Sequence, residues 1–156
     1  MFECNDNIKM INQTELKNYS DQIYNHFFSL SANDRNLRFC YPITDHALNE
    51  YIDDMINKEK DADYILIIID NILIGFAQFC YYNENTAELA LSVIEEYRGL
   101  KIGKLIFEWG MELAKEKNKV IFISCKSSNK PITSMMRKNE FKITFEDSEA
   151  IGHLYK

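Results

Sequence analysis

Glycine and proline are scarce in this chain of 156 residues, which contains 5 Gly and 2 Pro. Collagen-like and linker-rich chains depend on these residues, and disordered chains have a low apolar content, whereas 46% of this sequence is apolar. The composition therefore excludes all of these classes. We expect a single domain over residues 1–156, since domains average about 150 residues and a chain of this length can bury most of its surface.

Positive charge is also in short supply. The chain has 18 Lys and Arg against 24 Asp and Glu, which gives a formal net charge of −6. A protein that binds nucleic acid needs a basic patch, so we expect no nucleic-acid partner. The acidic balance suits cationic partners but does not choose among them.

The cysteines form no pattern that indicates a disulfide framework or a zinc site. They are Cys4, Cys40, Cys80 and Cys125, far apart and without a C-x-x-C motif. We therefore expect no metal and a location in the reducing cytoplasm.

The longest apolar run, 64–69, is far shorter than the roughly 20 residues of a membrane helix, and the first ten residues lack a signal-peptide pattern, so we expect no membrane association. Frequent Ile, Asn and Lys favour an AT-rich, bacterial source.

The spacing of apolar residues predicts the order β-α-α-β-β-β-α-β-α-β-β. Helices are predicted over 14–30, 44–57, 102–113 and 131–139, with Thr14 and Thr44 as N-caps. Strands are predicted over 8–11, 63–70, 72–82, 86–93 and 120–125, with two more in 141–155. We expect an α/β (α+β) fold with a mixed, mostly antiparallel sheet of six or seven strands and helices on both faces.

A polar loop with two glycines follows the strand predicted over 86–93. Its sequence is Tyr97-Arg-Gly-Leu-Lys-Ile-Gly103, and a helix is predicted to begin directly after it. Unpaired N–H groups at a helix start attract anions, and glycine lets the backbone approach a phosphate. Arg98, Lys101 and Lys104 add positive charge here. The loop is interpreted as a phosphate or pyrophosphate site, and a plain β–α turn is the alternative.

This loop resembles the acetyl-CoA pyrophosphate loop of the GNAT superfamily of N-acetyltransferases. The family pattern is Gln or Arg, two residues, Gly, one residue, then Gly or Ala. Arg98 and Gly103 match its two ends. Lys101 stands where the family has its first Gly, and its ammonium could contact phosphate directly.

Two other regions resemble the same family. In 128–141, Asn129 and Phe141 match a helical segment whose Asn contacts the cofactor, while Glu140 replaces a Gly. Met136 replaces the Tyr that protonates the leaving thiolate in many members. Upstream, 30–39 and 87–93 are similar to the branch that includes bacterial protein-lysine acetyltransferases.

The resemblance implies a GNAT fold with acetyl-CoA as co-substrate, bound between two splayed strands at 87–93 and 120–125. It implies that backbone groups of Leu91, Ser92 and Val93 bind the acetyl carbonyl and pantetheine. The residues it assigns to the pyrophosphate are Arg98, Gly99, Leu100, Lys101, Ile102, Gly103 and Lys104, and Asn129 also contacts the cofactor. Homodimers are common in the superfamily, so a homodimer is one possible assembly.

Acyl transfer to an amine requires that the amine lose a proton, because a lysine-like amine has a pKa of about 10.4. Glu88 is the candidate general base, since acidic residues are unfavourable in strands and partial burial would raise its proton affinity. A solvent-facing or salt-bridged glutamate is the alternative. For the general acid no residue stands out, and Ser124, Cys125, Tyr81, Tyr82 or water could serve.

Other chemically capable side chains are interpreted mainly as structural. His26 and Trp109 fall on apolar helix faces, and His46 falls in a helix start. His153, in the last strand, could approach the acceptor. Arg35 and Arg38 could line the entrance to the acceptor site, with helix capping or ion pairing as the alternative.

The sequence thus predicts an N-acetyltransferase that moves an acetyl group from acetyl-CoA to a primary amine by direct attack in a ternary complex. The acceptor could be a protein lysine, a protein N-terminus or a small amine such as a polyamine or an aminoglycoside. One alternative is a non-catalytic acyl-CoA-binding module, because Lys101, Met136 and Glu140 depart from the family pattern. Another is an enzyme that uses a longer acyl-CoA.

Overall fold

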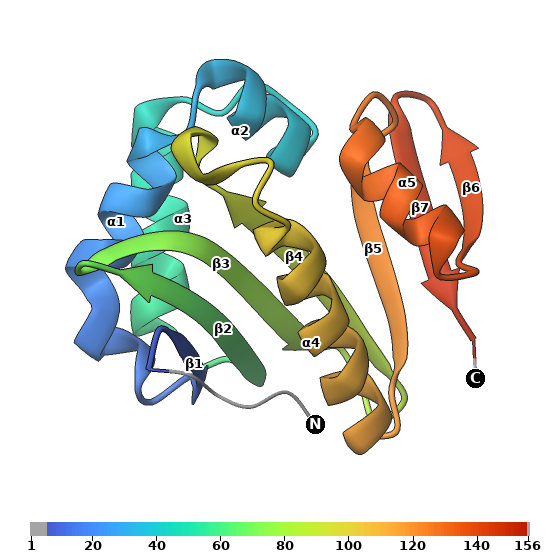
Figure 1. Cartoon of the computed structure of the whole chain (residues 1–156), viewed down its shortest axis with the longest axis horizontal. Coiled ribbons are helices and arrows are strands. Elements are labelled where there is room, and N and C mark those ends of the chain that lie inside the picture. The colour runs from blue at the N-terminus through green and yellow to red at the C-terminus, as the bar shows by residue number, and fades with distance from the viewer. Residues whose placement is uncertain (1–5, 156) are drawn as a thin grey trace.

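The computed structural model describes residues 6–155, which form one seven-stranded sheet in the order β1-β2-β3-β4-β5-β7-β6 (Figure 1). The strands are β1 Ile8–Asn12, β2 Ala62–Ile69, β3 Ile72–Tyr81, β4 Thr86–Val93, β5 Val120–Lys126, β6 Lys142–Glu146 and β7 Glu149–Leu154. All neighbouring pairs are antiparallel except β4 and β5. The predicted fold class is therefore confirmed.

Five α-helices and two 3₁₀ turns connect the strands in the described part of the chain. The helices are α1 Ser20–Ser29, α2 Ala32–Phe39, α3 Asp45–Asn57, α4 Ile102–Glu116 and α5 Lys130–Lys138, and the turns are η1 Leu16–Tyr19 and η2 Glu95–Tyr97. In Figure 1, α4 and α5 lie on the near face of the sheet, and α1 and α3 lie on the far face. Helices cover both faces, as predicted.

Strand β3 contacts the helices on both faces of the sheet. On β3, Phe76 faces Phe27 of α1 with the ring centroids 5.4 Å apart. A Cβ added to the neighbouring Gly75 would lie 2.8 Å from Ile106 of α4. Because successive residues of a strand point to opposite faces, one strand packs against both helix layers. Glycine at this position lets α4 approach the sheet closely.

Helix α2 is absent from the predicted element order. None of its residues is buried, so it lacks the apolar stripe from which the other helices were recognised. It is set instead by its N-cap, since the Ser31 hydroxyl accepts a hydrogen bond from the Asp34 N–H at 3.1 Å. The fold therefore has three helices, not two, between β1 and β2.

The prediction that Thr14 caps the first helix is wrong. The side-chain oxygen of Asn12 accepts hydrogen bonds from the N–H groups of Thr14 and Glu15, at 3.0 and 3.2 Å. This turn leads into η1, and α1 begins only at Ser20. The second predicted cap is confirmed, because the Thr44 hydroxyl accepts from the Ala47 N–H at 3.1 Å.

The cysteines in the described residues, Cys40, Cys80 and Cys125, are free thiols. Cys4 and the first part of the segment considered for a signal peptide lie outside the described residues. No helix within residues 6–155 combines the length and the hydropathy needed to cross a membrane.

Candidate active site

The central feature of the site is the separation of β4 from β5. Their parallel register consists of three pairs, Thr86 with Val120, Ala87 with Ile121 and Glu88 with Phe122. Beyond Glu88, β4 continues to pair with β3 and β5 continues to pair with β7. The two strands therefore form a V that is closed at Glu88 and open towards Val93.

A cavity of about 490 Å³ occupies the V, within the range of small-molecule and cofactor sites. Its walls are Leu89–Val93 of β4, Ile123–Cys125 of β5, the loop and helix start at Tyr97–Gly99 and 101–104, the α2 region at Leu30, Asp34, Leu37 and Arg38, and the α5 start at Asn129, Pro131, Ile132 and Met135. All of the predicted cofactor residues line this cavity except Leu100, which is exposed. The predicted base Glu88 also lies outside the lining.

The loop before α4 is shaped by two left-handed residues. Gly99 has φ +76° and Lys101 has φ +61°. The left-handed conformation costs a residue with a side chain about 1 kcal/mol, so the glycine of the family pattern is conformationally easier here than Lys101. In α4 the N–H of Leu105 bonds to the carbonyl of Lys101, so the N–H groups of the preceding residues have no partner within the helix. These groups border the cavity and favour an anion there.

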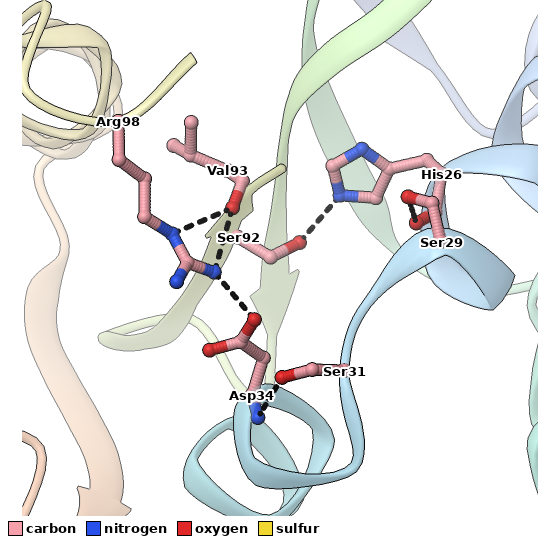
Figure 2. Close-up of polar contacts among 7 residues, drawn as sticks. All are labelled: His26, Ser29, Ser31, Asp34, Ser92, Val93 and Arg98. Carbon is pink, nitrogen blue, oxygen red and sulfur yellow. Dashed lines mark hydrogen bonds and ion pairs between the residues drawn. The ribbon is translucent and has the colours of Figure 1, made fainter. Parts of the chain in front are cut away.

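Arg98 links the mouth of the V to α2 (Figure 2). Its Nε and Nη2 donate to the carbonyl of Val93 at 3.3 and 3.2 Å, and Nη2 forms an ion pair with Asp34 at 2.8 Å. Burial alone would raise the pKa of Asp34, but hydrogen bonds from Arg98 and from the Ser31 hydroxyl hold the pKa of this carboxyl below its usual value. The guanidinium is therefore engaged by protein groups.

Helix α2 is tied to both arms of the V. Asp34 joins it to the β4 side through Arg98, and Lys126 of β5 donates to the side-chain oxygen of Asn36 at 3.1 Å. Arg38 of the same helix lines the cavity, and its guanidinium lies 4.9 Å from the ring centroid of Phe39. Arg35 instead pairs with Asp45, which is the ion-pairing alternative considered for it.

Glu88 lies at the closed end of the V, half-buried on the face of the sheet that α1 covers. The Tyr82 hydroxyl donates to its carboxylate at 2.7 Å. This hydrogen bond, helped by partial burial, raises the pKa of Tyr82 to about 12. Phe122 of β5 is the register partner of Glu88 on one side and of His153 of β7 on the other, so these three residues lie in one row across the sheet.

The α5 region meets the cavity through its start. Asn129 is the N-cap of α5, with its side-chain oxygen 3.4 Å from the N–H of Ile132, and Pro131 lies in the first turn as predicted. Met136 is fully buried between α5 and β7, and its sulfur lies 2.3 Å from where a Cβ on Gly152 would be. Glu140, at φ +63°, takes the left-handed backbone conformation that suits the glycine of the family pattern.

Cys125 and His46 have environments that argue against a role in the chemistry. Burial raises the pKa of the Cys125 thiol to about 11, so it is not a thiolate at neutral pH. His46 is exposed and lies 3.3 Å from Glu50 on the surface of α3. Within residues 6–155 there is no group of three His, Cys, Asp or Glu side chains that could hold a metal ion.

Sequence reasoning missed the roles of Asp34 and His26. Asp34 stands three residues after Ser31, and this Ser-x-x-Asp spacing is a helix-start signal that could have found α2. The sequence places His26 in the core or on the surface, and the structure shows it buried, with 2% of its surface exposed. Its ring contacts both Leu73 and Ser92, which are far away in sequence, so no local pattern announces these contacts.

Solved structures resemble this fold at low sequence identity. The GNAT domain of S. lividans PAT superposes with a TM-score of 0.73 at 12% identity, over 94% of this chain and 88% of that one. The PaiA N-acetyltransferase from Thermoplasma acidophilum, in complex with coenzyme A, gives 0.66 at 19% identity, over 96% and 99%. A GNAT family acetyltransferase from Elizabethkingia anophelis with acetyl-CoA bound gives 0.59 at 15%, over 97% and 100%. These likenesses concern the fold.

No curated protein matches the sequence. The model of the acetyltransferase (GNAT) family matches residues 23–141, a stretch that runs from α1 to the residue before β6 and includes the whole V. The chain therefore belongs to the GNAT family of acetyl-CoA-dependent N-acetyltransferases.

Proposed function

We propose that this protein transfers an acetyl group from acetyl-CoA to a primary amine by direct attack in a ternary complex. The observation that carries the proposal is the cavity between β4 and β5, with the start of α4 at its mouth. A thioester arm fits between the two strands, where the β4 residues 91–93 have no β5 partner. The backbone N–H groups at the start of α4 suit the pyrophosphate.

Glu88 is proposed as the general base. The amine nitrogen attacks the thioester carbonyl carbon, the C–S bond breaks, and the thiolate of CoA leaves. The proton from the amine passes to the Glu88 carboxylate through a water molecule, since Glu88 stands outside the cavity lining. The carboxylate shares the α1 side of β4 with Ser92, whose side chain reaches α1, because the two residues are an even number apart on the strand.

The acceptor is an amine whose identity stays open between a protein lysine, a protein N-terminus and a small amine. A screen with acetyl-CoA against a lysine-containing peptide, spermidine and an aminoglycoside, read by thiol release and by mass spectrometry, decides among them. Acetylation of any of these supports the proposal. The same screen with propionyl-CoA and longer acyl-CoAs sets the length of the acyl chain.

Glu88→Gln tests the base directly. We expect kcat to fall about 100-fold, the lower range for loss of a general base, with acetyl-CoA affinity unchanged. Glu84→Gln, in the exposed turn before β4, is the matched control and should retain full activity. An unchanged kcat in Glu88→Gln would contradict the assignment of the base.

A second candidate function is a non-catalytic acyl-CoA-binding module. The observation in its favour is Met136, which is fully buried and has no proton to give to a leaving thiolate. Saturable CoA binding by the wild type without acetylation of any amine in the screen would select this alternative.

A further inference from the structure

His26 is a buried imidazole with both ring nitrogens engaged. It lies in the last turn of α1, is 2% exposed, and packs against the rings of Phe27 and Phe76. Its Nδ1 lies 2.8 Å from the carbonyl oxygen of Leu73, and its Nε2 lies 2.7 Å from the Ser92 hydroxyl. Figure 2 shows the Ser92 side chain extending from β4 to this ring.

These two partners determine where the protons are. A carbonyl oxygen can only accept, so Nδ1 must carry the proton. Burial, with Arg38 nearby, lowers the pKa of His26 to about 4 despite the bond to Leu73, so the ring is neutral at physiological pH. In the neutral ring Nε2 has only a lone pair, and the Ser92 hydroxyl must therefore donate to it.

Ser92 consequently offers only lone pairs to any ligand. It lines the cavity in the open part of the V, where β4 has lost its β5 partner. The neighbouring Val93 points to the opposite face, 3.8 Å from the Cβ position of Gly103 in α4. The Ser92 side chain thus faces the part of the cavity that lies towards α1 and α2.

We propose that Ser92 is a subsite for an N–H donor, and that His26 is a positioning residue that makes the hydroxyl an acceptor only. The inference rests on the proposed function for the place of the thioester. A freely rotating hydroxyl could donate to the lone pair of the attacking amine and block the reaction. With its proton held by His26, Ser92 accepts from an amine N–H and leaves that lone pair free to attack.

The same chemistry could come from two ligands, the acceptor amine or an amide N–H of the pantetheine arm. Ser92 faces α1 and α2, away from α4, whose start is the proposed pyrophosphate site. Its orientation therefore favours the amine over the pantetheine arm. The test therefore measures both the kinetics with spermidine and a lysine-containing peptide and the affinity for CoA. Ser92→Ala removes the acceptor, and His26→Leu removes the group that orients it.

We expect Ser92→Ala and His26→Leu to lower kcat/KM for the amine about 10-fold, as the loss of one hydrogen bond implies, with CoA affinity within 2-fold of the wild type. His26→Gln should recover most of the loss, because its amide can donate to Leu73 and accept from Ser92. Ser29→Ala is the matched control. The Ser29 hydroxyl donates to the His26 carbonyl at 2.7 Å, so its loss perturbs the same turn without changing the ring.

A loss of CoA affinity in Ser92→Ala and His26→Leu, with unchanged amine kinetics, would identify pantetheine as the N–H source and still support the subsite. Ser29→Ala should keep wild-type amine kinetics and CoA affinity. If Ser92→Ala and His26→Leu also keep wild-type values in both measurements, the subsite is overturned. The nitrogen-15 shifts of His26 give a readout that needs no turnover. Protonated Nδ1 and bare Nε2 at pH 7 are expected, and a proton on Nε2 would overturn the positioning role.

Failure of the proposed function looks different. In that case the wild type acetylates none of the amines, whatever residue stands at position 92. The subsite is then judged by CoA affinity and the imidazole shifts alone, and unchanged affinity in Ser92→Ala would overturn it.

Discussion

The two walls of the cavity are built from different materials. The wall at the start of α4 comes from one stretch of the chain, 98–104 without Leu100, where the first N–H groups of the helix have no partner within the helix. The facing wall comes from β4 and the α2 region, with Ser92 and Asp34 among its side chains, and His26 of α1 lies behind it, bonded to Ser92. A backbone site needs only a local conformation, whereas a side-chain site needs long-range contacts. The comparison explains why the family was recognisable from sequence and the acceptor was not.

A charge placed on the backbone wall should give the largest effect. Gly103→Glu puts a carboxylate beside the helix start, where we expect it to repel the phosphates of CoA and weaken binding at least 100-fold by calorimetry. Gly103→Ala is the matched control. Its Cβ would lie 3.8 Å from Val93, an ordinary contact, so it should fold and bind CoA. Equal CoA affinity in the two variants would contradict the assignment of the α4 start as the anion site.

Acid should act on the side-chain wall through His26. The pKa of His26 is lowered by burial from 6.5 to about 4, so between these values the unfolded chain binds the additional proton. The contribution of His26 to stability is therefore present above pH 6.5 and is lost as the pH falls towards 4. From pH 7 to pH 5 this amounts to roughly 2 kcal/mol. Urea unfolding at both pH values should show this loss in the wild type and not in His26→Leu.

The ion pair between the walls should have a smaller effect. Asp34→Asn removes a carboxylate with 13% exposure from an Arg98 that is 44% exposed, so solvent weakens the pair. We expect a loss of about 1 kcal/mol at pH 7. Because the pKa of Asp34 is lowered, this stabilisation is present above about pH 4 and disappears as the pH falls through the folded value. Equal stability of variant and wild type at pH 7 would contradict a structural role for the pair.

The smallest effect is expected at the two left-handed residues Lys101 and Glu140, where the cost of the backbone conformation can be separated from the effect of the Lys101 charge on CoA binding. Lys101→Gly and Glu140→Gly each remove a side chain from a left-handed residue, and each should stabilise the fold by about 0.5 kcal/mol in urea unfolding. Lys101→Gly should also weaken CoA binding a few-fold, because an ammonium at the cavity is lost. Glu140→Gly should leave CoA binding unchanged. Equal effects of both variants on CoA binding would show that the Lys101 charge does not contribute.

Most of the fold was predictable because burial imposes period and alternation on the sequence. The apolar stripe of α3 and its Thr44 cap, and the continuous apolar run of β2, each pointed to the element that is found. Helix α2 is not predictable from apolar spacing because it buries no residue. The prediction of Thr14 as an N-cap is wrong because the Asn12 side chain accepts from the backbone N–H groups at this turn.

The candidate site divides in the same way. The loop 98–104 was predictable as an anion site from local residues, and all of its members except Leu100 line the cavity. The link between His26 and Ser92 spans 66 residues and depends on tertiary packing, so no spacing rule could supply it. The single domain, the bacterial source, the cytoplasmic location and the homodimer remain predictions.

A thermal-shift titration with acetyl-CoA, with CoA and ATP as comparisons, tests the account most directly. At 100 times its dissociation constant a ligand adds about 2.7 kcal/mol of stability, which should raise the unfolding midpoint of a chain of this size by roughly 5–10 °C. The account predicts this shift with acetyl-CoA and CoA and little shift with ATP. No shift with either CoA species would contradict the claim that the V between β4 and β5 is a working cofactor site.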